Sequence, residues 1–188
     1  MLPSTTIVRP PGTLRRCVSI GALLLLALLQ GCAHDRRSIG SMVDDSAVEL
    51  KATGILTTDP AYKDAHVNVT SVNGILLLSG EAPTAEVRDS LLASVRAIPS
   101  IRRIVNEVRI APASTFAQRS HDAWITGKVK SRLVGTRGLY SSRITVVTEN
   151  TSVFLLGLVS QRESELATTA ATNVLGIERV VKLFEYVD

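Results

Sequence analysis

The sequence predicts an α+β protein made of two tandem αββαβ domains, each a three-stranded sheet with two helices on one face. An internal repeat, a helical apolar period and a strand-like alternation lead to this prediction. A shift of 77 positions superimposes, without a gap, Asp45 on Asp122, Lys51 on Lys128, Leu56 on Leu133, Val69 on Val146, Asn73 on Asn150 and Gly80 on Gly157. A period this long indicates tandem domains and not a solenoid.

Each copy begins with a predicted helix, because apolar residues recur there at every fourth position. The two stripes are Val48, Ala52, Leu56 and Ile125, Val129, Leu133. Two strands follow in each copy. In the first copy residues 65–70 alternate between apolar and polar, and Asn73-Gly74 is typical of a tight hairpin turn. The second copy has Thr151 at the glycine position, so a tight primed turn is less strongly indicated there.

A second helix follows each hairpin, and a third strand ends the unit. Pro83 precedes this helix in the first copy, and in the second copy Ser160 and Glu163 have capping-box spacing. Because both helices have one apolar face and the strands alternate, we expect both helices on one side of the sheet. We expect the matching Gly80 and Gly157 where the second strand leaves the sheet, at a point where a side chain would crowd the following helix.

The N-terminus has the pattern of a secretory signal. Arg15-Arg16 precede an apolar segment, residues 18–29, which ends in Leu29-Gln30-Gly31-Cys32. About a dozen apolar residues are too few to span a bilayer, which needs roughly 20. The order of charged region, apolar region and small-residue site predicts a cleaved signal peptide over residues 1–31. The alternative is an N-terminal anchor helix that is left uncleaved.

The last four residues of this segment resemble the lipobox of bacterial lipoproteins. The resemblance implies cleavage before Cys32, a diacylglycerol on its sulfur and an acyl chain on its amine. Ala33, and not an aspartate, follows the cysteine. The resemblance therefore implies a lipid-anchored protein on the periplasmic face of the outer membrane.

Removal of residues 1–31 changes both the charge and the cysteine content. This segment carries Arg9, Arg15 and Arg16 and no acid, so the formal charge of +4 falls to about +1 in the mature chain. The basic composition therefore says little about nucleic acid, and the envelope location excludes nucleic acid as a partner. With Cys17 removed and Cys32 acylated, no thiol remains to pair, and stability depends on packing alone.

The predicted divisions of the chain follow from the repeat and the N-terminal pattern. They are a lipoprotein signal peptide over 1–31, a lipidated cysteine with a polar tether over 32–44, a first domain over 45–111, a linker over 112–121 and a second domain over 122–188.

The repeated unit resembles the BON domain. The motifs that carry the resemblance are Gly74-x-Leu76-x-Leu78-x-Gly80 and Ile104-x-Asn106-x-Val108 in the first copy, and Val153-x-Leu155-x-Gly157 in the second. Two BON-like units behind a lipobox resemble the dual-BON outer-membrane lipoproteins over nearly all of the mature chain. The resemblance implies a non-enzymatic protein that supports envelope integrity. It also implies binding of anionic phospholipid, such as phosphatidylglycerol or cardiolipin, chiefly through the first helix of the second domain.

The charges of that helix support the same expectation independently. Between positions 122 and 143 the second copy has five basic residues against the single acid Asp122, whereas positions 45–66 of the first copy have two lysines against four acids. Trp124 lies one helical turn from Lys128. Tryptophan beside lysine is typical of a membrane interface. The alternative is that Trp124 packs against the neighbouring domain, as most single tryptophans are buried.

We therefore predict a lipid-binding site at Trp124, Lys128, Lys130, Arg132, Leu139 and Tyr140. Leu139 and Tyr140 fit equally well a role in closing the corner between helix and strand. Acyl chains anchor a protein without help from side chains, and each basic residue near an anionic surface adds only about 1 kcal/mol. The tether raises the local concentration of the patch, so a weak affinity is enough for sensing lipid composition or curvature.

The strand residues that face away from the helices differ between the copies. They are Leu77, Ser79, Val105 and Glu107 in the first copy and Phe154, Leu156, Val181 and Leu183 in the second. The second set is too apolar to face water. Packing against the first domain is our first hypothesis, and a separate protein partner is the second. A separate partner would suit the alternative function, an adaptor or envelope-stress factor that acts on outer-membrane or peptidoglycan-remodelling proteins.

The sequence predicts neither a catalytic site nor a site for a metal or cofactor. We expect His34, His66 and His121 to be solvated, because they assemble neither a metal site nor a Ser/His/Asp arrangement. Glu163 and Glu165 fit a charged helix start and not paired catalytic carboxylates. The sequence has no glycine-rich loop of the kind that cradles phosphates.

Overall fold

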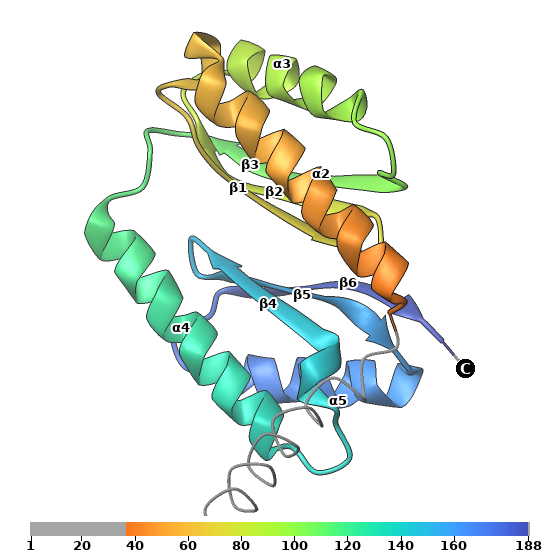
Figure 1. Cartoon of the computed structure of the whole chain (residues 1–188). Helices are drawn as coiled ribbons and strands as arrows, with labels where there is room; N and C mark the ends of the chain where they lie inside the picture. The colour runs from red at the N-terminus through yellow and green to blue at the C-terminus, as the bar shows by residue number, and fades with distance from the viewer. Residues whose placement is uncertain (1–36, 188) are drawn as a thin grey trace, which may run out of the picture. The chain divides into compact units, whose positions relative to one another are not determined.

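A computed structural model of the chain describes residues 37–187 (Figure 1). Within this range two copies of one αββαβ unit follow each other, each with its own three-stranded sheet. The predicted α+β fold of two tandem domains is therefore confirmed. The predicted signal peptide over 1–31 and the lipidation site Cys32 lie outside the described residues.

The first domain places two helices over one face of its sheet (Figure 1). Its elements are α2 (Ile39–Thr58), the 3-10 helix η2 (Pro60–Tyr62), β1 (His66–Val72), β2 (Ile75–Ala82), α3 (Ala85–Arg96) and β3 (Arg103–Ile110). The central strand β2 is antiparallel to β1 and parallel to β3. Val48 and Ala52 of α2 pack against Leu76 and Leu78 of β2, so the predicted helical stripe lies in the core.

The second domain repeats this arrangement (Figure 1). Its elements are α4 (Phe116–Gly135), the 3-10 helix η3 (Ser141–Arg143), β4 (Ile144–Glu149), β5 (Ser152–Val159), α5 (Gln161–Thr172) and β6 (Arg179–Tyr186). Strand β5 is antiparallel to β4 and parallel to β6. Ile125 and Val129 of α4 lie in the second core with Val153 and Leu155 of β5. Ser160 and Glu163 form the predicted capping box of α5.

Both first helices begin earlier than the sequence analysis predicted. Helix α2 begins at Ile39, inside the expected tether, where the Ser38 hydroxyl accepts the N–H of Ser41 at 3.0 Å. Helix α4 begins at Phe116, inside the expected linker, where Thr115 caps it. The early turns were missed because they contribute no residue to the core before position 45 in α2 or 122 in α4, and the apolar period detects only the buried face.

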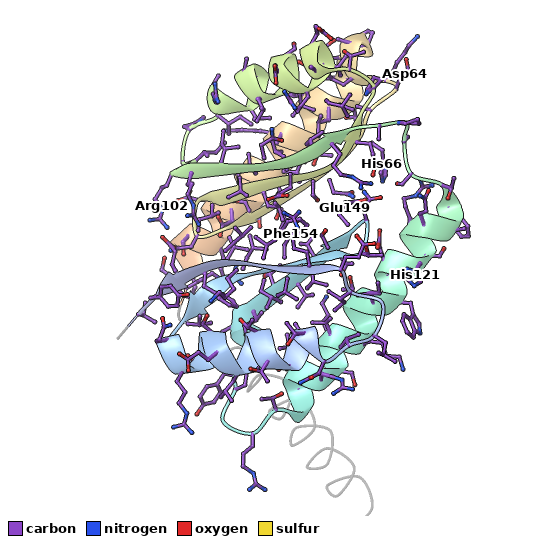
Figure 2. The ribbon with its side chains drawn as sticks, turned by 180° about the vertical axis from the view of Figure 1, so that it is seen from behind. Asp64, His66, Arg102, His121, Glu149 and Phe154 are labelled. Carbon is purple, nitrogen blue, oxygen red and sulfur yellow. The ribbon has the colours of Figure 1, made fainter. Side chains whose placement is uncertain are left out.

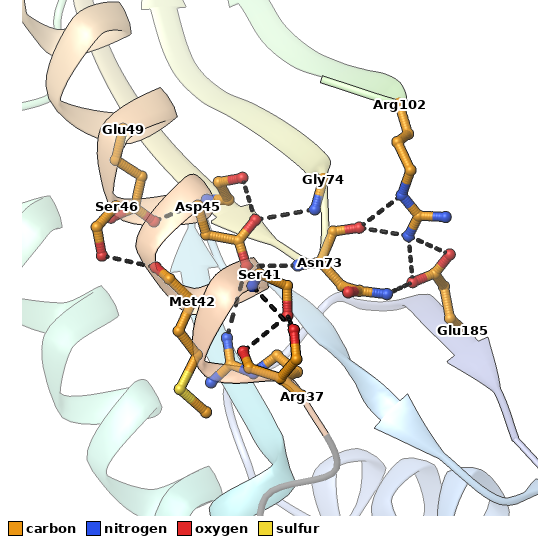
Figure 3. Close-up of polar contacts among 12 residues, drawn as sticks. Arg37, Ser41, Met42, Asp45, Ser46, Glu49, Asn73, Gly74, Arg102 and Glu185 are labelled. Atoms are coloured by element: carbon orange, nitrogen blue, oxygen red, sulfur yellow. Dashed lines mark hydrogen bonds and ion pairs between the residues drawn. The ribbon is translucent and has the colours of Figure 1, made fainter. Parts of the chain in front are cut away.

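A buried aspartate from each first helix holds the hairpin turn of its own domain. Asp45 accepts the N–H of Asn73 at 2.6 Å on one carboxylate oxygen and the N–H of Gly74 at 2.8 Å on the other (Figure 3). Asp122 accepts the two N–H groups of the second turn in the same way, both at 2.9 Å. Each first helix thus holds the hairpin turn in place, and the N–H groups of the turn satisfy the hydrogen-bonding capacity of the buried carboxylate.

Both turns are tight, including the one that lacks glycine. The central residues have positive φ angles in each turn: 51° and 74° at Asn73 and Gly74, and 49° and 59° at Asn150 and Thr151. Type I′ turns require this conformation at both positions. A β-branched residue with positive φ is a genuine outlier. The second turn therefore carries backbone strain at Thr151 that the first turn avoids with glycine.

The two matching strand glycines are required by the neighbouring strand and not by a helix. A Cβ atom on Gly80 would lie 2.0 Å from the carbonyl oxygen of His66, and one on Gly157 would lie 2.1 Å from that of Arg143. Both glycines lie inside their strands and not at the ends. The prediction that a side chain would crowd the following helix is therefore wrong, because the obstacle is the paired backbone.

The open faces of the two sheets pack against each other. Phe154, Leu156 and Leu183 of the second sheet form one apolar cluster with Val72 and Leu77 of the first, and Figure 2 shows Phe154 between the sheets. Phe154 is 1% exposed. This packing confirms the hypothesis that the apolar face of the second sheet is covered by the first domain.

Each domain also donates a hydrogen bond from its hairpin turn to a glutamate of the other. The side-chain amide of Asn73 donates to Glu185 of β6, and that of Asn150 donates to Glu81 of β2. The Arg102 guanidinium lies 2.6 Å from both carboxylate oxygens of Glu185 (Figure 3). These reciprocal bonds fix the position of one sheet on the other at both ends of the apolar cluster.

A buried carboxylate, Glu149, lies at one edge of this contact. The Asn68 amide donates to it at 2.7 Å. Burial raises the pKa of Glu149, and the nearby carboxylates of Glu81 and Asp122 raise it further. The Asn68 bond and the charge of Arg109 oppose this change, and the net effect is a raised pKa. Ionised Glu149 is therefore a source of instability at this edge.

A candidate surface on helix α4

Helix α4 is fixed by a reciprocal cap at its start and by one buried face along its length. The Thr115 hydroxyl accepts the N–H of Gln118, and the Gln118 side chain accepts the N–H of Thr115 at 2.7 Å. The buried face consists of Asp122, Ile125, Val129 and Leu133. The opposite face points away from the sheet and is free for contact with a ligand or surface.

Three large apolar side chains are exposed on this outer face. Phe116 is 79% exposed, Trp124 is 51% exposed and Val134 is 73% exposed. With 100° per residue, Phe116 and Val134 lie on one line along the helix and Trp124 lies roughly 80° around from it. Ser120, Gly127 and Ser131 lie between these two positions around the helix, so only small side chains separate the exposed apolar residues. Single exposed apolar residues are common on protein surfaces, but a group of three large ones on one helix face is not.

Trp124 is held by two neighbours on its own helix. The Lys128 ammonium lies 5.3 Å from the centre of the indole ring. The ring of His121 stacks on the indole with centres 5.9 Å apart and an interplanar angle of 20°. The alternative that Trp124 packs against the neighbouring domain does not hold, because the side chain is half exposed. The structure thus brings together Trp124 and Lys128 as an exposed pair of aromatic ring and cation.

Lys130 lies roughly 40° around the helix from Phe116 and Val134, whereas Arg132 lies roughly 160° around from them, and the two side chains line different hollows. Lys130 and Val134 line a hollow of about 290 Å³ together with Ser141 and Ser142. Arg132 lines a groove of about 760 Å³ between α4 and α5, which also contains Arg162 and Glu165. Arg132 lies in the last turn of α4, where a cation also interacts favourably with the helix dipole.

The two residues after Gly138 have different surroundings. Leu139 packs against the second core, so we leave it out of the candidate surface. Tyr140 is 48% exposed and lies under the Arg143 guanidinium, 4.2 Å from the ring centre. Arg143 also bonds the buried Glu163 at 2.7 Å. Tyr140 therefore borders the surface, whereas Arg143 is engaged in holding the domain together.

Glu163 is a structural carboxylate. Burial raises its pKa, but the bonds from the Ser160 backbone and hydroxyl and the charge of Arg143 outweigh burial, so the net pKa lies below the ordinary value. This agrees with the predicted charged helix start.

Phe116 and Val134 were missed by the sequence analysis. Phe116 fell in the expected linker, although Thr115 and Gln118 have the spacing of a capping box and could have shown that the helix begins there. Val134 follows the core residue Leu133 directly and gives no separate signal.

Within residues 37–187, no helix is both long enough and apolar enough to cross a membrane. Over the same residues, no group of three or more histidine, cysteine, aspartate or glutamate side chains is arranged to hold a metal ion.

The chain matches the BON domain model at two places, residues 44–112 and 121–188. It is 34% identical over 157 residues to Outer membrane lipoprotein DolP of Haemophilus influenzae. This alignment covers 83% of this chain and 81% of the relative. It is 35% identical over 154 residues to the 21 kDa hemolysin of Actinobacillus pleuropneumoniae, covering 81% and 79%. Identity to Osmotically-inducible protein Y of Escherichia coli is 22% over 145 residues, covering 76% and 72%.

These matches cover both copies of the repeat and most of the relatives' own length, and the αββαβ unit is present twice in the structure. The chain therefore belongs to the BON-domain family and is a lipid-anchored outer-membrane lipoprotein of the dual-BON DolP type.

Proposed function

We propose that this lipoprotein binds anionic phospholipid, such as phosphatidylglycerol or cardiolipin, through the outer face of α4 and in this way supports envelope integrity without catalysis. The observation that carries the proposal is the exposed pair of Trp124 and Lys128. An indole at the headgroup level with an ammonium beside it meets both the apolar and the anionic part of a lipid surface.

The outer face of α4 has the dimensions of an interfacial contact. Phe116 and Val134 are eighteen positions apart, which corresponds to roughly 27 Å along a helix. Trp124 lies between them along the helix. A helix that presents apolar side chains on one face with cations at its margins lies in the plane of the interface and does not cross the bilayer. The hollow beside Lys130, with its two serine hydroxyls, is a candidate position for a lipid phosphate.

The expected affinity is modest. Lys128 and Lys130 contribute about 1 kcal/mol each near an anionic surface. The lipid anchor keeps the surface at high local concentration beside the membrane, so a weak contact is enough to respond to lipid composition. We propose Cys32 as the acylated residue that provides this anchor.

The alternative adaptor function was based on the apolar open face of the second sheet, and this face is covered by the first domain. Phe154, Leu156 and Leu183 pack against the first domain and are not available to a separate protein.

Vesicle co-sedimentation of the soluble form that lacks residues 1–32 tests the proposal. Trp124→Glu should abolish binding to phosphatidylglycerol or cardiolipin vesicles, because it removes the apolar anchor and adds a repelled charge. Reversal of Lys128 and Lys130 to Glu should weaken binding at least roughly 30-fold, which corresponds to the loss of about 2 kcal/mol. The difference should shrink as salt rises.

Two matched variants sharpen this test. Lys51→Glu changes the equivalent lysine of the first domain and should have little effect. Gly127→Leu should strengthen binding, because a Cβ at Gly127 meets open space and the first copy already has Leu50 at this position. Circular dichroism controls for folding. Wild-type binding by a folded Trp124→Glu protein excludes this site, and equal binding to neutral vesicles excludes the electrostatic part.

A further inference from the structure

The outer face of α2 carries an apolar stripe that the fold does not use. Ile39 is 82% exposed, Val43 is 62% exposed and Leu50 is 75% exposed. At 100° per residue these three side chains lie within roughly 40° of one another around the helix. None of them belongs to a core cluster among the described residues. The stripe faces away from Val48 and Ala52, which anchor α2 to its sheet.

This stripe differs in charge from the outer face of α4. Superposition of the repeats places Ile39 on Phe116 and Leu50 on Gly127, but the first copy has Thr53 where α4 has Lys130. Residues 39–58 contain one lysine against three acids. The stripe is therefore suited to an apolar surface and has no preference for an anionic one.

The covalent chain limits the distance between this stripe and the proposed lipid anchor at Cys32. Seven peptide units connect Cys32 to Ile39 in the sequence. Fully extended, they span at most roughly 25 Å, whatever their conformation. Acyl chains on Cys32 hold that residue at the membrane surface, so the first turn of α2 cannot move further than this from the headgroups. Leu50 lies only roughly 17 Å further along the helix.

We propose that the outer face of α2 is a second membrane contact of this lipoprotein. Ile39, Val43 and Leu50 rest on the lipid surface beside the anchor by burial of apolar area, independently of lipid charge. The short connection to Cys32 makes this an intramolecular event, so three partly inserted side chains suffice. The proposal depends on acylation near residue 32 and not on lipid binding by α4.

The mature lipidated protein, reconstituted at low density in neutral phosphatidylcholine vesicles, provides the test. Its acylated Cys32 leaves no other thiol, so a single introduced cysteine can carry a polarity-sensitive fluorophore. Val43→Cys and Leu50→Cys probe the stripe, and Asp44→Cys is the matched control, since Asp44 is exposed but lies roughly 100° around the helix from Val43. Neutral lipid is used because α4 gains no electrostatic attraction there.

We expect a blue-shifted emission and quenching by nitroxide-labelled lipids at positions 43 and 50, with neither effect at position 44. Ile39→Gln combined with Leu50→Gln should remove both effects from the label at position 43. Circular dichroism should be unchanged, because the side chains are exposed and glutamine is a good helix former.

Three results would overturn the proposal. One is equal quenching at positions 43, 44 and 50. Another is a blue shift at position 43 without lipid quenching that grows with protein density, which would indicate a second copy of the chain on the stripe. The third is quenching that survives the double glutamine variant. Repeating the measurement with Trp124→Glu separates the two contacts, since that variant removes the proposed lipid binding by α4 and should leave the signal at position 43 intact.

Discussion

The turn between β4 and β5 stores strain that one glycine would relieve. Thr151 has a φ angle of 59°, and a residue with a Cβ in the left-handed region costs about 1–2 kcal/mol. Thr151→Gly removes that cost but lowers stability by about 0.5–1 kcal/mol through the greater freedom of glycine in the unfolded chain. The backbone N–H that Asp122 accepts is retained. The difference between the two effects is a net gain of about 0–1.5 kcal/mol.

Urea unfolding of the whole chain measures this gain as a higher midpoint with an unchanged slope. About 1 kcal/mol corresponds to a rise in Tm of roughly 2–4 °C for a protein of this size.

The reverse change in the first domain is the matched control. Gly74→Thr places a Cβ in the same left-handed region at a φ angle of 74°, only 2.9 Å from the Arg102 side chain that bonds Glu185. It should lower stability by at least about 1–2 kcal/mol. If Thr151→Gly lowers stability, or if both changes have the same sign, strain at Thr151 is not what distinguishes the turns.

Three further changes have expected outcomes. Gly80→Ala should unfold the first domain and reduce the steady-state amount of protein through proteolysis. Gly54→Ala is the control: its Cβ meets open space, so it should be neutral or stabilising by up to about 1 kcal/mol. Equal stability of the two variants would contradict the close contact between Gly80 and the neighbouring strand. The folded pKa of Glu149 is raised, so the stability of the wild-type protein falls as pH rises through that pKa. Glu149→Gln should therefore be more stable than wild type near neutral pH and equally stable below pH 4.5. Urea midpoints at both pH values measure this difference. The pKa of Glu163 is lowered, so Glu163→Gln should be less stable than wild type at neutral pH, with the gap closing as pH falls through the folded pKa; a gap that does not depend on pH would contradict this assignment.

The repeat and its buried periods were readable from the sequence because core positions obey simple geometry. Val48 and Ile125 recur with their helical neighbours at every fourth residue, and burial enforces that spacing. The helix starts were not readable in this way. Ile39 and Phe116 are apolar but point outward, so they do not join the core stripes that marked the helices.

The candidate surface was only partly readable for a related reason. Residue type does not decide between a buried and an exposed tryptophan, and the structure was needed to show that Trp124 is exposed. Leu139 illustrates the opposite outcome. Gly138 turns the chain with a φ angle of 82°, and Leu139 packs against the core. Such a change of direction depends on the backbone conformation, which an apolar pattern does not encode.

The sheet-to-sheet contact makes each half of the chain the cover of the other. Cut at the connection, the second half would present Phe154, Leu156 and Leu183 to water, and it would pair with itself or aggregate. Binding or stability measured on an isolated half would therefore reflect its exposed apolar sheet and not the properties of the intact lipoprotein. Because each sheet covers the other, the roles of α2 and α4 must be assigned by substitutions in the intact chain.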